Sequence, residues 1–339
     1  MQPSSLNTKS ITLDTQSLTS PLRPELDLSI VVPLFNEEES LPELMDWIEK
    51  VLADRDHEVV FVDDGSTDGS WSVIQGLKQK YGDRVRGISF ARNQGKSAAL
   101  HSGFRLVKGK VVITMDADLQ DSPDEIPELE RRIVEDGLDL VSGWKQKRFD
   151  PLTKTVPTKL YNWATRRVSG IQLHDFNCGL KAYRREVVRA VEVNGEMHRY
   201  IPVLAKQAGF SKIGEQVVQH RARKYGTTKF GLERFVNGFL DLLTIAFIGR
   251  FGNKPMHLFG VAGTLMFCLG FGLLGAIGGY KVWAMSSGIE AKNIADISAF
   301  YLALVFMVMG LQLFLAGFLG EMVTRNSPAR NHYLLKDQV

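Results

Sequence analysis

Two aspartates, Asp116 and Asp118, stand directly after the apolar run 111–115 and are the clearest sign of chemistry in this chain. Such a run is typical of a buried strand, and residues two apart on an extended chain point to the same side, so both carboxylates and Gln120 can converge. Hard oxygen ligands suit Mg²⁺ or Mn²⁺, which usually bind one or two carboxylates together with substrate phosphates. The stretch therefore predicts a metal site for a nucleotide diphosphate. The alternative is an acidic loop that caps a helix beginning near Pro123.

The composition limits the class of protein. The chain has 339 residues, of which 44% are hydrophobic and 23% charged, enough for a full core and a second region. A formal net charge of +3 is too small to indicate a nucleic-acid partner. Cys178 lies in a polar stretch and Cys268 in an apolar one, so neither a disulfide framework nor a cysteine metal site is expected, which fits a reducing cytosol.

The pattern of apolar residues predicts an α/β domain. Residues 1–26 are rich in Ser and Thr and are expected to form a disordered extension. Strands are then predicted over 28–33, 58–62, 85–90, 111–115 and 139–142, and helices near 41–52, 70–81, 97–107 and 124–135. This alternation is typical of a mainly parallel sheet flanked by helices.

Polar segments follow four of the predicted strands, at 33–38, 63–69, 92–96 and 116–121. Ligands of such sheets bind beyond the carboxyl ends of the strands. Any one segment could be an ordinary turn, because Asn, Asp, Gly and Ser suit turns for backbone reasons. Four of them together favour a ligand site.

Two apolar runs, about 256–282 and 297–320, are each long enough to cross a bilayer as a helix. A buried hairpin inside a soluble domain is the alternative. Lys and Arg precede the first run and follow the second, which places the soluble domain 27–228, the tail 321–339 and both termini on the cytoplasmic side of the inner membrane. Gly275 and Gly279 form a GxxxG pattern, which indicates a helix contact face.

Two further stretches are candidates for contact with the membrane surface. The juxtamembrane segment 229–255 is amphipathic and is expected to lie on the lipid headgroups, with packing on the soluble domain as the alternative. The basic and aromatic stretch 154–167, which contains Trp163, is the second candidate.

A nucleotide site, an acidic turn and a membrane hairpin together call for a reaction between a water-soluble nucleotide and a lipid. In these features the chain resembles the polyprenyl-phosphate (dolichol-phosphate) glycosyltransferases, membrane-attached members of the inverting family 2. The resemblance covers roughly 27–335 and rests on the segments 31–37, 62–68, 92–96, 116–121, 175–181 and 223–229. It implies a GT-A-type (Rossmann-like) domain, interfacial amphipathic helices and a two-helix transmembrane hairpin.

The resemblance also implies roles for single residues in the donor site. Those implied to bind the nucleotide-sugar are Pro33, Phe35, Glu37, Asp64, Asn93, Lys96 and Asp116. Asp118 and Gln120, with Asp116 less directly, are implied to hold an Mg²⁺ or Mn²⁺ that neutralises charge on the departing nucleotide.

The acceptor site needs cationic side chains that bind the lipid phosphate more than it needs a general base, because this phosphate is already anionic near neutral pH. Arg223 and Lys229 match the family's R-x-x-G-x-S-K element, in which Thr228 here replaces Ser, and Arg199 is a further candidate phosphate contact. A lipid-facing basic rim is the alternative for the first two, and a helix cap for Arg199. The implied catalytic set is Asp118, Asp175, Arg223 and Lys229, with Asp175 as an acid near the acceptor.

We therefore expect a membrane enzyme that moves one sugar, with inversion, from a nucleotide-sugar to a polyprenyl phosphate on the cytoplasmic face, for cell-envelope glycan or lipid modification. UDP-glucose is the favoured donor, and GDP-mannose or another UDP-sugar is the alternative. A homo-oligomer, such as a tetramer, is implied by the resemblance alone.

Three rival classes have sequence features that can be checked. A processive polysaccharide synthase should carry a Gln-x-x-Arg-Trp element and more membrane spans, and the sequence has neither. A nicotinamide-binding enzyme should have a G-x-G-x-x-G turn after its first strand, where this chain has Pro-Leu-Phe-Asn-Glu. A non-catalytic nucleotide-binding scaffold would lose the metal carboxylates, and both are present.

Overall fold

The computed structural model describes residues 26–146, 162–195, 197–221, 254–290 and 292–326, together with the single residues 224, 244, 247 and 251. Several sequence predictions lie outside these residues. They are the N-terminal extension, most of the juxtamembrane segment, the C-terminal tail beyond 326, and the candidate acceptor residues Arg223 and Lys229.

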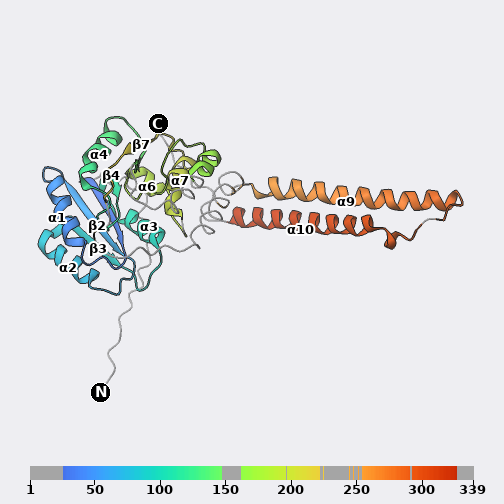
Figure 1. Ribbon diagram of the computed structural model, residues 1–339, viewed down its shortest axis with the longest axis horizontal. Coiled ribbons are helices and arrows are strands. Elements are labelled where there is room, and N and C mark those ends of the chain that lie inside the picture. The colour runs from blue at the N-terminus through green and yellow to red at the C-terminus, as the bar shows by residue number, and fades with distance from the viewer. Residues whose placement is uncertain are drawn as a thin grey trace, which may run out of the picture.

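A seven-stranded sheet forms the centre of the soluble domain (Figure 1). Its order is β3-β2-β1-β4-β6-β5-β7. Every described pairing is parallel except those of β6, which runs antiparallel to both β4 and β5. The strands are β1 (Leu26–Leu34), β2 (His57–Asp63), β3 (Val85–Ser89), β4 (Gly109–Thr114), β5 (Leu140–Trp144), β6 (Lys181–Arg184) and β7 (Ile213–Val217).

The sequence predicted the first five strands and missed β6 and β7. The central strands β2 and β4 are easy to find because each contains a continuous apolar run that is buried between two helical layers. β6 has only four residues and begins and ends with a cation, while β7 is half-buried at the sheet edge and contains glycine and two polar residues. Neither has the apolar alternation by which a strand is recognised.

Helices cover both faces of the sheet, as predicted (Figure 1). Alternate residues of β1 point to opposite faces, so Ile30 packs with one layer and Val31 with the other. The first layer holds α1 (Leu41–Val51), α2 (Ser70–Tyr81) and α4 (Ile126–Val134). The second holds α3 (Lys96–Leu106), α6 (Arg185–Ala190) and α7 (Ile201–Gln207).

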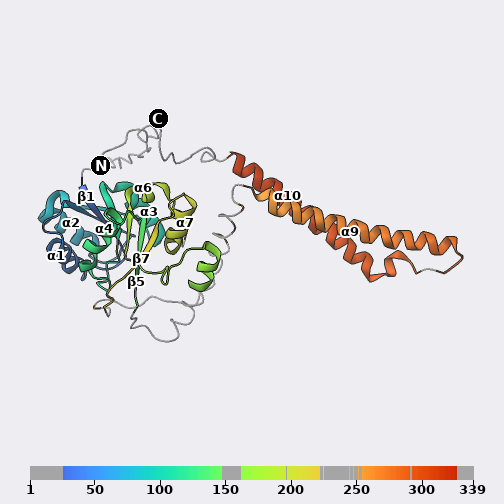
Figure 2. The same ribbon diagram turned by 90° about the horizontal axis from the view of Figure 1, so that it is seen from above.

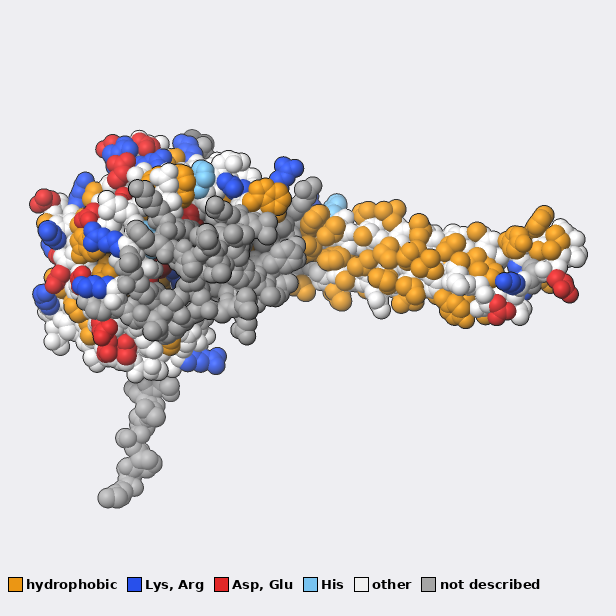
Figure 3. Space-filling model, viewed as in Figure 1, with side chains coloured by type: hydrophobic (Ala, Val, Ile, Leu, Met, Phe, Trp, Pro, Cys, Tyr) orange, Lys and Arg blue, Asp and Glu red, His pale blue; other side chains and the backbone are white. Residues whose placement is uncertain are grey.

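Two long antiparallel helices, α9 (Pro255–Ser286) and α10 (Ser298–Asn326), extend away from the soluble domain (Figures 1 and 2). Both are long and apolar enough to cross a membrane. Hydrophobic side chains cover the visible face of this hairpin, and charged side chains gather at its far tip (Figure 3). A helix over residues 162–169 includes the described end of the basic and aromatic stretch 154–167. It exposes Trp163, which is 59% accessible.

Glycines form the contact between α9 and α10, but not the two that the GxxxG pattern indicated. A Cβ added to Gly310 would lie 2.6 Å from the Phe267 amide nitrogen, and one added to Gly263 would lie 2.5 Å from the Gly310 carbonyl oxygen. Gly275 and Gly279 have no atom within 4 Å of such a Cβ, so that prediction is wrong for this hairpin. α9 is apolar on every side, and sequence spacing alone therefore does not show which face meets α10.

We predict that Gly310→Leu forces the two helices apart, because a side chain at this position has no space. Overpacking of this kind costs about 1–3 kcal/mol. The midpoint of thermal unfolding of the detergent-solubilised protein should fall by several degrees. Gly275→Leu is the matched control, since it makes the same substitution in open space and should leave the midpoint near the wild-type value. Equal midpoints for the two variants would contradict the observed contact.

Candidate active site

The loops after β1 and β2 are joined by hydrogen bonds at the carboxyl edge of the sheet. The Asn36 side chain accepts a hydrogen bond from the Thr67 amide at 2.8 Å, and the Glu37 amide donates to the Ser70 hydroxyl at 2.9 Å. Among the predicted nucleotide contacts here, Glu37 and Phe35 are half-buried in the loop. Pro33 is buried within β1 itself.

Asp64, predicted to bind the nucleotide-sugar, also organises the loop after β3. Its carboxylate accepts hydrogen bonds from the amides of Gln94 at 2.6 Å and Gly95 at 2.9 Å. Gly95 has φ +93°, a conformation that L side chains rarely adopt, and Lys96 begins α3 immediately afterwards. Asp64 therefore sets the position from which Lys96 reaches the site. Asn93 is exposed in the same loop.

The Lys96 ammonium donates a hydrogen bond to the Asp116 carboxylate, each side chain being about one-third exposed. Burial by itself would raise the pKa of Asp116. The charge and hydrogen bond of Lys96, together with the charges of Lys145 and His198, outweigh burial and lower that pKa to about 2. Asp116 is therefore ionised at neutral pH and is already paired with a cation.

The acidic turn bends sharply after Asp118. The Asp118 carboxylate accepts a hydrogen bond from the Gln120 amide at 3.1 Å, and Leu119 between them has φ +59°, which is uncommon for a residue with a side chain. Asp118 is only 7% exposed, while the Gln120 side chain is half-buried. The turn thus joins Asp118 to the backbone of Gln120, two of the three predicted metal ligands, and the metal role of all three stays a prediction.

These donors fit a hard divalent cation whose remaining ligands come from a substrate. Within the part of the chain that the structure describes, no group of three or more His, Cys, Asp and Glu side chains is arranged to hold a metal alone. Two carboxylates and an amide oxygen in one turn are instead the partial set that Mg²⁺ or Mn²⁺ takes when phosphate oxygens supply the rest.

Lys145 is a site cation that the sequence reasoning missed. It follows the last residue of β5, and its ammonium lies 2.7 Å from a carboxylate oxygen of the fully buried Asp121. Burial opposes the charge of Lys145, but Asp121 and Asp116 outweigh it and raise the pKa of Lys145. The strand-end rule could have found this residue, because it stands at the carboxyl end of a predicted strand.

The segment before β6 closes the other side of Asp116. A Cβ added to Gly179 would lie 2.6–2.8 Å from the three carboxyl atoms of Asp116, so any side chain there would force this carboxylate to move. Two hydrogen bonds hold this segment, one from the Thr114 hydroxyl to the Gly179 carbonyl at 2.9 Å and one from the Lys181 ammonium to the Cys178 carbonyl. Burial lowers the pKa of Lys181. Cys178 is buried, which raises the pKa of its thiol to about 12.

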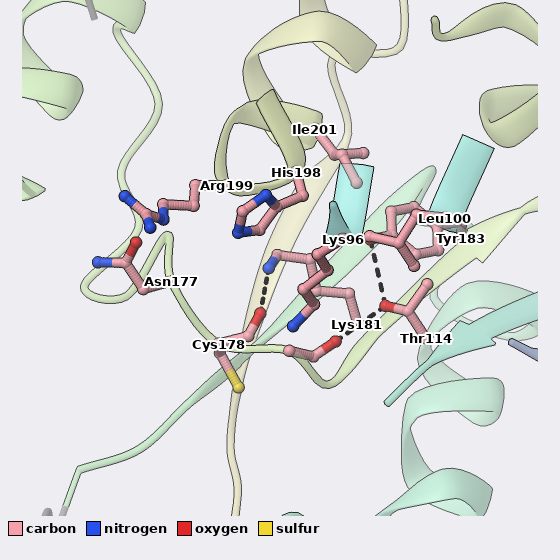
Figure 4. Close-up of a pocket in the computed structure, with 11 residues that line it drawn as sticks. Lys96, Leu100, Thr114, Asn177, Cys178, Lys181, Tyr183, His198, Arg199 and Ile201 are labelled. Atoms are coloured by element: carbon pink, nitrogen blue, oxygen red, sulfur yellow. Dashed lines mark hydrogen bonds between the residues drawn. The ribbon is translucent and has the colours of Figure 1, made fainter. Parts of the chain in front are cut away.

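A small pocket lies where these segments meet, and the side chains of Lys96, Lys181 and His198 surround it (Figure 4). Its volume is about 10 Å³, near the smallest that holds one water molecule, so a sugar does not fit inside it. His198 is held by two 3.1 Å contacts with the Ser97 hydroxyl, and Arg199 beside it is 8% exposed. Lys96, Lys181 and Arg199 thus give this pocket a cationic lining, and such side chains attract anions.

Asp175 lies inside its loop, with only 1% of the residue exposed. Its carboxylate accepts a hydrogen bond from the Asn177 amide at 3.0 Å, and its carbonyl accepts one from the Ser142 hydroxyl at 3.3 Å. The structure thus places Asp175 in the segment that leads to Gly179 and the acidic turn.

The segment after β7 packs against the acidic turn. The Arg221 amide donates to the Gln120 carbonyl at 2.9 Å, and its guanidinium lies 4.2 Å from the centre of the Trp47 ring. Lys224 binds Glu43 of α1 at 2.6 Å. These contacts fix the chain two residues before and one residue after the predicted acceptor residue 223.

Comparisons with known proteins agree with this geometry. The profile of "Glycosyl transferase family 2" matches residues 29–191. The chain is 33% identical over 320 residues to dodecaprenyl-phosphate galacturonate synthase of Rhizobium johnstonii, covering 91% of this chain and 93% of that protein. It is 34% identical over 301 residues to undecaprenyl-phosphate 4-deoxy-4-formamido-L-arabinose transferase of Pseudomonas aeruginosa, covering 88% and 85%.

Solved structures show the same fold at lower sequence identity. Glucosyl-3-phosphoglycerate synthase of Mycobacterium tuberculosis in complex with UDP has a TM-score of 0.52 and 20% identity, over 69% of this chain and 84% of that chain. The same enzyme with Mn²⁺, UDP-glucose and phosphoglyceric acid has a TM-score of 0.51. The predicted GT-A-type domain is thereby confirmed, and the chain belongs to glycosyl transferase family 2.

Proposed function

We propose that this chain transfers a sugar from a nucleoside-diphosphate sugar to a polyprenyl phosphate. The observation that carries the proposal is the acidic turn, two of whose aspartates are paired with lysines, in a chain that also has two membrane-length helices. Relatives named for transfer to dodecaprenyl or undecaprenyl phosphate align over about nine-tenths of the chain, so the likeness includes the helices as well as the soluble domain.

In this proposal, Asp118, Gln120 and, less directly, Asp116 hold an Mg²⁺ or Mn²⁺. When bound, such an ion stabilises the negative charge that develops on the departing nucleoside diphosphate. Lys96 keeps Asp116 ionised and in place before the metal arrives. The structure of the mycobacterial synthase with Mn²⁺ and UDP-glucose supports use of a divalent ion on this fold.

The proposed reaction is a single displacement. A lipid phosphate oxygen forms a bond to the anomeric carbon while the bond from that carbon to the nucleoside diphosphate breaks, and attack from the opposite side inverts the configuration. The attacking oxygen and the leaving oxygen both belong to phosphates. The lipid phosphate is already anionic near neutral pH, so no proton has to be removed from the nucleophile. The protein therefore has to bind two anions, the lipid phosphate and the nucleoside diphosphate, close together. Its proposed cations for that task are Lys96, Lys145, Arg199, Arg223 and Lys229.

The proposed location is the inner membrane, with α9 and α10 crossing the bilayer and the soluble domain on the cytoplasmic face. The proposed donor is a UDP-sugar. UDP-glucose remains the donor predicted from the sequence. The relatives add two candidate sugars, because their names specify galacturonate and 4-deoxy-4-formamido-L-arabinose.

We predict that membranes containing the protein label their lipid fraction when supplied with polyprenyl phosphate and one radiolabelled donor from a panel. The panel holds UDP-glucose, UDP-galacturonate, UDP-4-deoxy-4-formamido-L-arabinose and GDP-mannose. The label should be released by mild acid, as expected for a sugar bound through a phosphate. Failure of every donor to label lipid above membranes lacking the protein would overturn the proposed function.

We predict that Asp118→Asn lowers the rate of lipid labelling by about 10²–10³-fold, since the neutral amide removes a charged metal ligand. EDTA should stop the wild-type reaction, and added Mg²⁺ or Mn²⁺ should restore it. Asp54→Asn is the control, because it makes the same change at an exposed aspartate far from the turn in sequence. Labelling by Asp118→Asn at the rate of the control would show that this carboxylate holds no essential metal.

We predict that Gly179→Ala lowers the turnover rate by about 10²-fold, because its methyl group displaces the Asp116 carboxylate and misplaced groups lose rate steeply. Gly76→Ala is the matched control, since an added Cβ there meets nothing within 4 Å. Turnover should be compared together with the midpoint of thermal unfolding. A Gly179→Ala enzyme that is folded and fully active would contradict the proposed role of Asp116.

A further inference from the structure

Glu215 lies on the edge strand β7 and holds the loop that contains Asp175. One of its carboxylate oxygens accepts hydrogen bonds from the amides of His174 at 2.7 Å and Asp175 at 3.0 Å. The other oxygen lies 2.7 Å from the His174 ring nitrogen Nδ1. The Glu215 side chain is 11% exposed and the His174 side chain is 55% exposed, so the carboxylate is largely buried while the imidazole reaches solvent.

A stacked ring fixes the geometry of this contact. The His174 imidazole lies against the Trp144 ring, with centres 4.1 Å apart and planes 13° from parallel. Trp144 is the last residue of β5, which pairs with β7 in the register Ser142 opposite Glu215. The carboxylate and the indole therefore belong to two adjacent strands of the sheet, and both contact the imidazole of the loop.

Two neutral groups also hold this loop next to Glu215. Ser142 donates to the Asp175 carbonyl at 3.3 Å, and the Asn162 amide donates to the His174 carbonyl at 2.8 Å. Hydrogen bonds to an ionised group are roughly twice as strong as neutral ones, so Glu215 contributes the strongest of these anchors.

The loop runs directly from this anchor to the acidic turn. Four residues beyond Asp175, Gly179 lies against the Asp116 carboxylate and is held by Thr114. The two ends of the loop are thus fixed from different strands, Glu215 of β7 at one end and Thr114 of β4 at the other. A shift at the first end changes where Asp175 lies relative to Asp116.

We infer that Glu215 is a positioning residue, which sets the place of Asp175 and of the loop surface that an acceptor phosphate meets. It acts through the His174 and Asp175 amides and does not itself contact the reacting atoms. The inference rests on the proposed function, and it concerns a residue outside every segment that carried the family resemblance.

Glu215→Ala should lower kcat for lipid labelling about 10- to 100-fold at saturating donor, since it releases three hydrogen bonds of the loop. The KM for the donor should stay within about twofold, because the donor side is held by other loops. Glu215→Gln should recover most of the rate, as its amide oxygen can accept both backbone hydrogen bonds and its amino group can donate to His174. Glu135→Ala, which removes an exposed carboxylate on the opposite helical layer, should behave as wild type.

Hydrogen exchange on the full-length protein in detergent gives a readout that does not need activity. A peptide covering 172–178 should exchange faster in Glu215→Ala than in the wild type, and Glu215→Gln should resemble the wild type. Wild-type kcat in Glu215→Ala, an equal loss in both Glu215 variants, or unchanged exchange would overturn the inference. Absence of lipid labelling by the wild type would instead overturn the proposed function, whatever the exchange shows.

Discussion

Charge balance around Asp116 is the constraint on which the site depends. Asp116, Asp118 and Asp121 stand within six residues, and carboxylates so close repel one another unless cations lie among them. Lys96 binds Asp116 from α3, and Lys145 binds Asp121 from the end of β5. The folded domain therefore places cations beside two of these three aspartates and offsets their mutual repulsion.

The antiparallel strand β6 explains how so many groups reach one place. Parallel strands bring their carboxyl ends to the site edge, which is how the segments after β1, β2, β3 and β4 meet. β6 runs the other way, with Lys181 beside Thr114, so the segment before it lies at that same edge. Gly179 and Asp175 therefore come to the acidic turn from a direction that no parallel strand could provide.

The soluble domain and the helical hairpin are packed in two different ways. In the soluble domain, buried polar groups hold loops at set distances from the acidic turn, and their hydrogen bonds make the site rigid. In the hairpin, glycines let α9 and α10 approach closely, since side chains would keep two helix backbones apart. The first arrangement positions anions, and the second presents a continuous apolar surface.

The sequence by itself determined the first five strands and the two long apolar helices, because these follow from local patterns. Apolar runs located β1 to β5, the spacing of Asp116, Asp118 and Gln120 predicted one turn, and two long apolar stretches predicted the hairpin. Only the tertiary structure decided the contacts between distant residues. Glu215 meets Asp175 across 40 positions, Thr114 meets Gly179 across 65, and Ser97 meets His198 across 101. No local periodicity encodes such pairs, since they follow from strand order and from the direction of β6, which depend on the packing of the whole sheet.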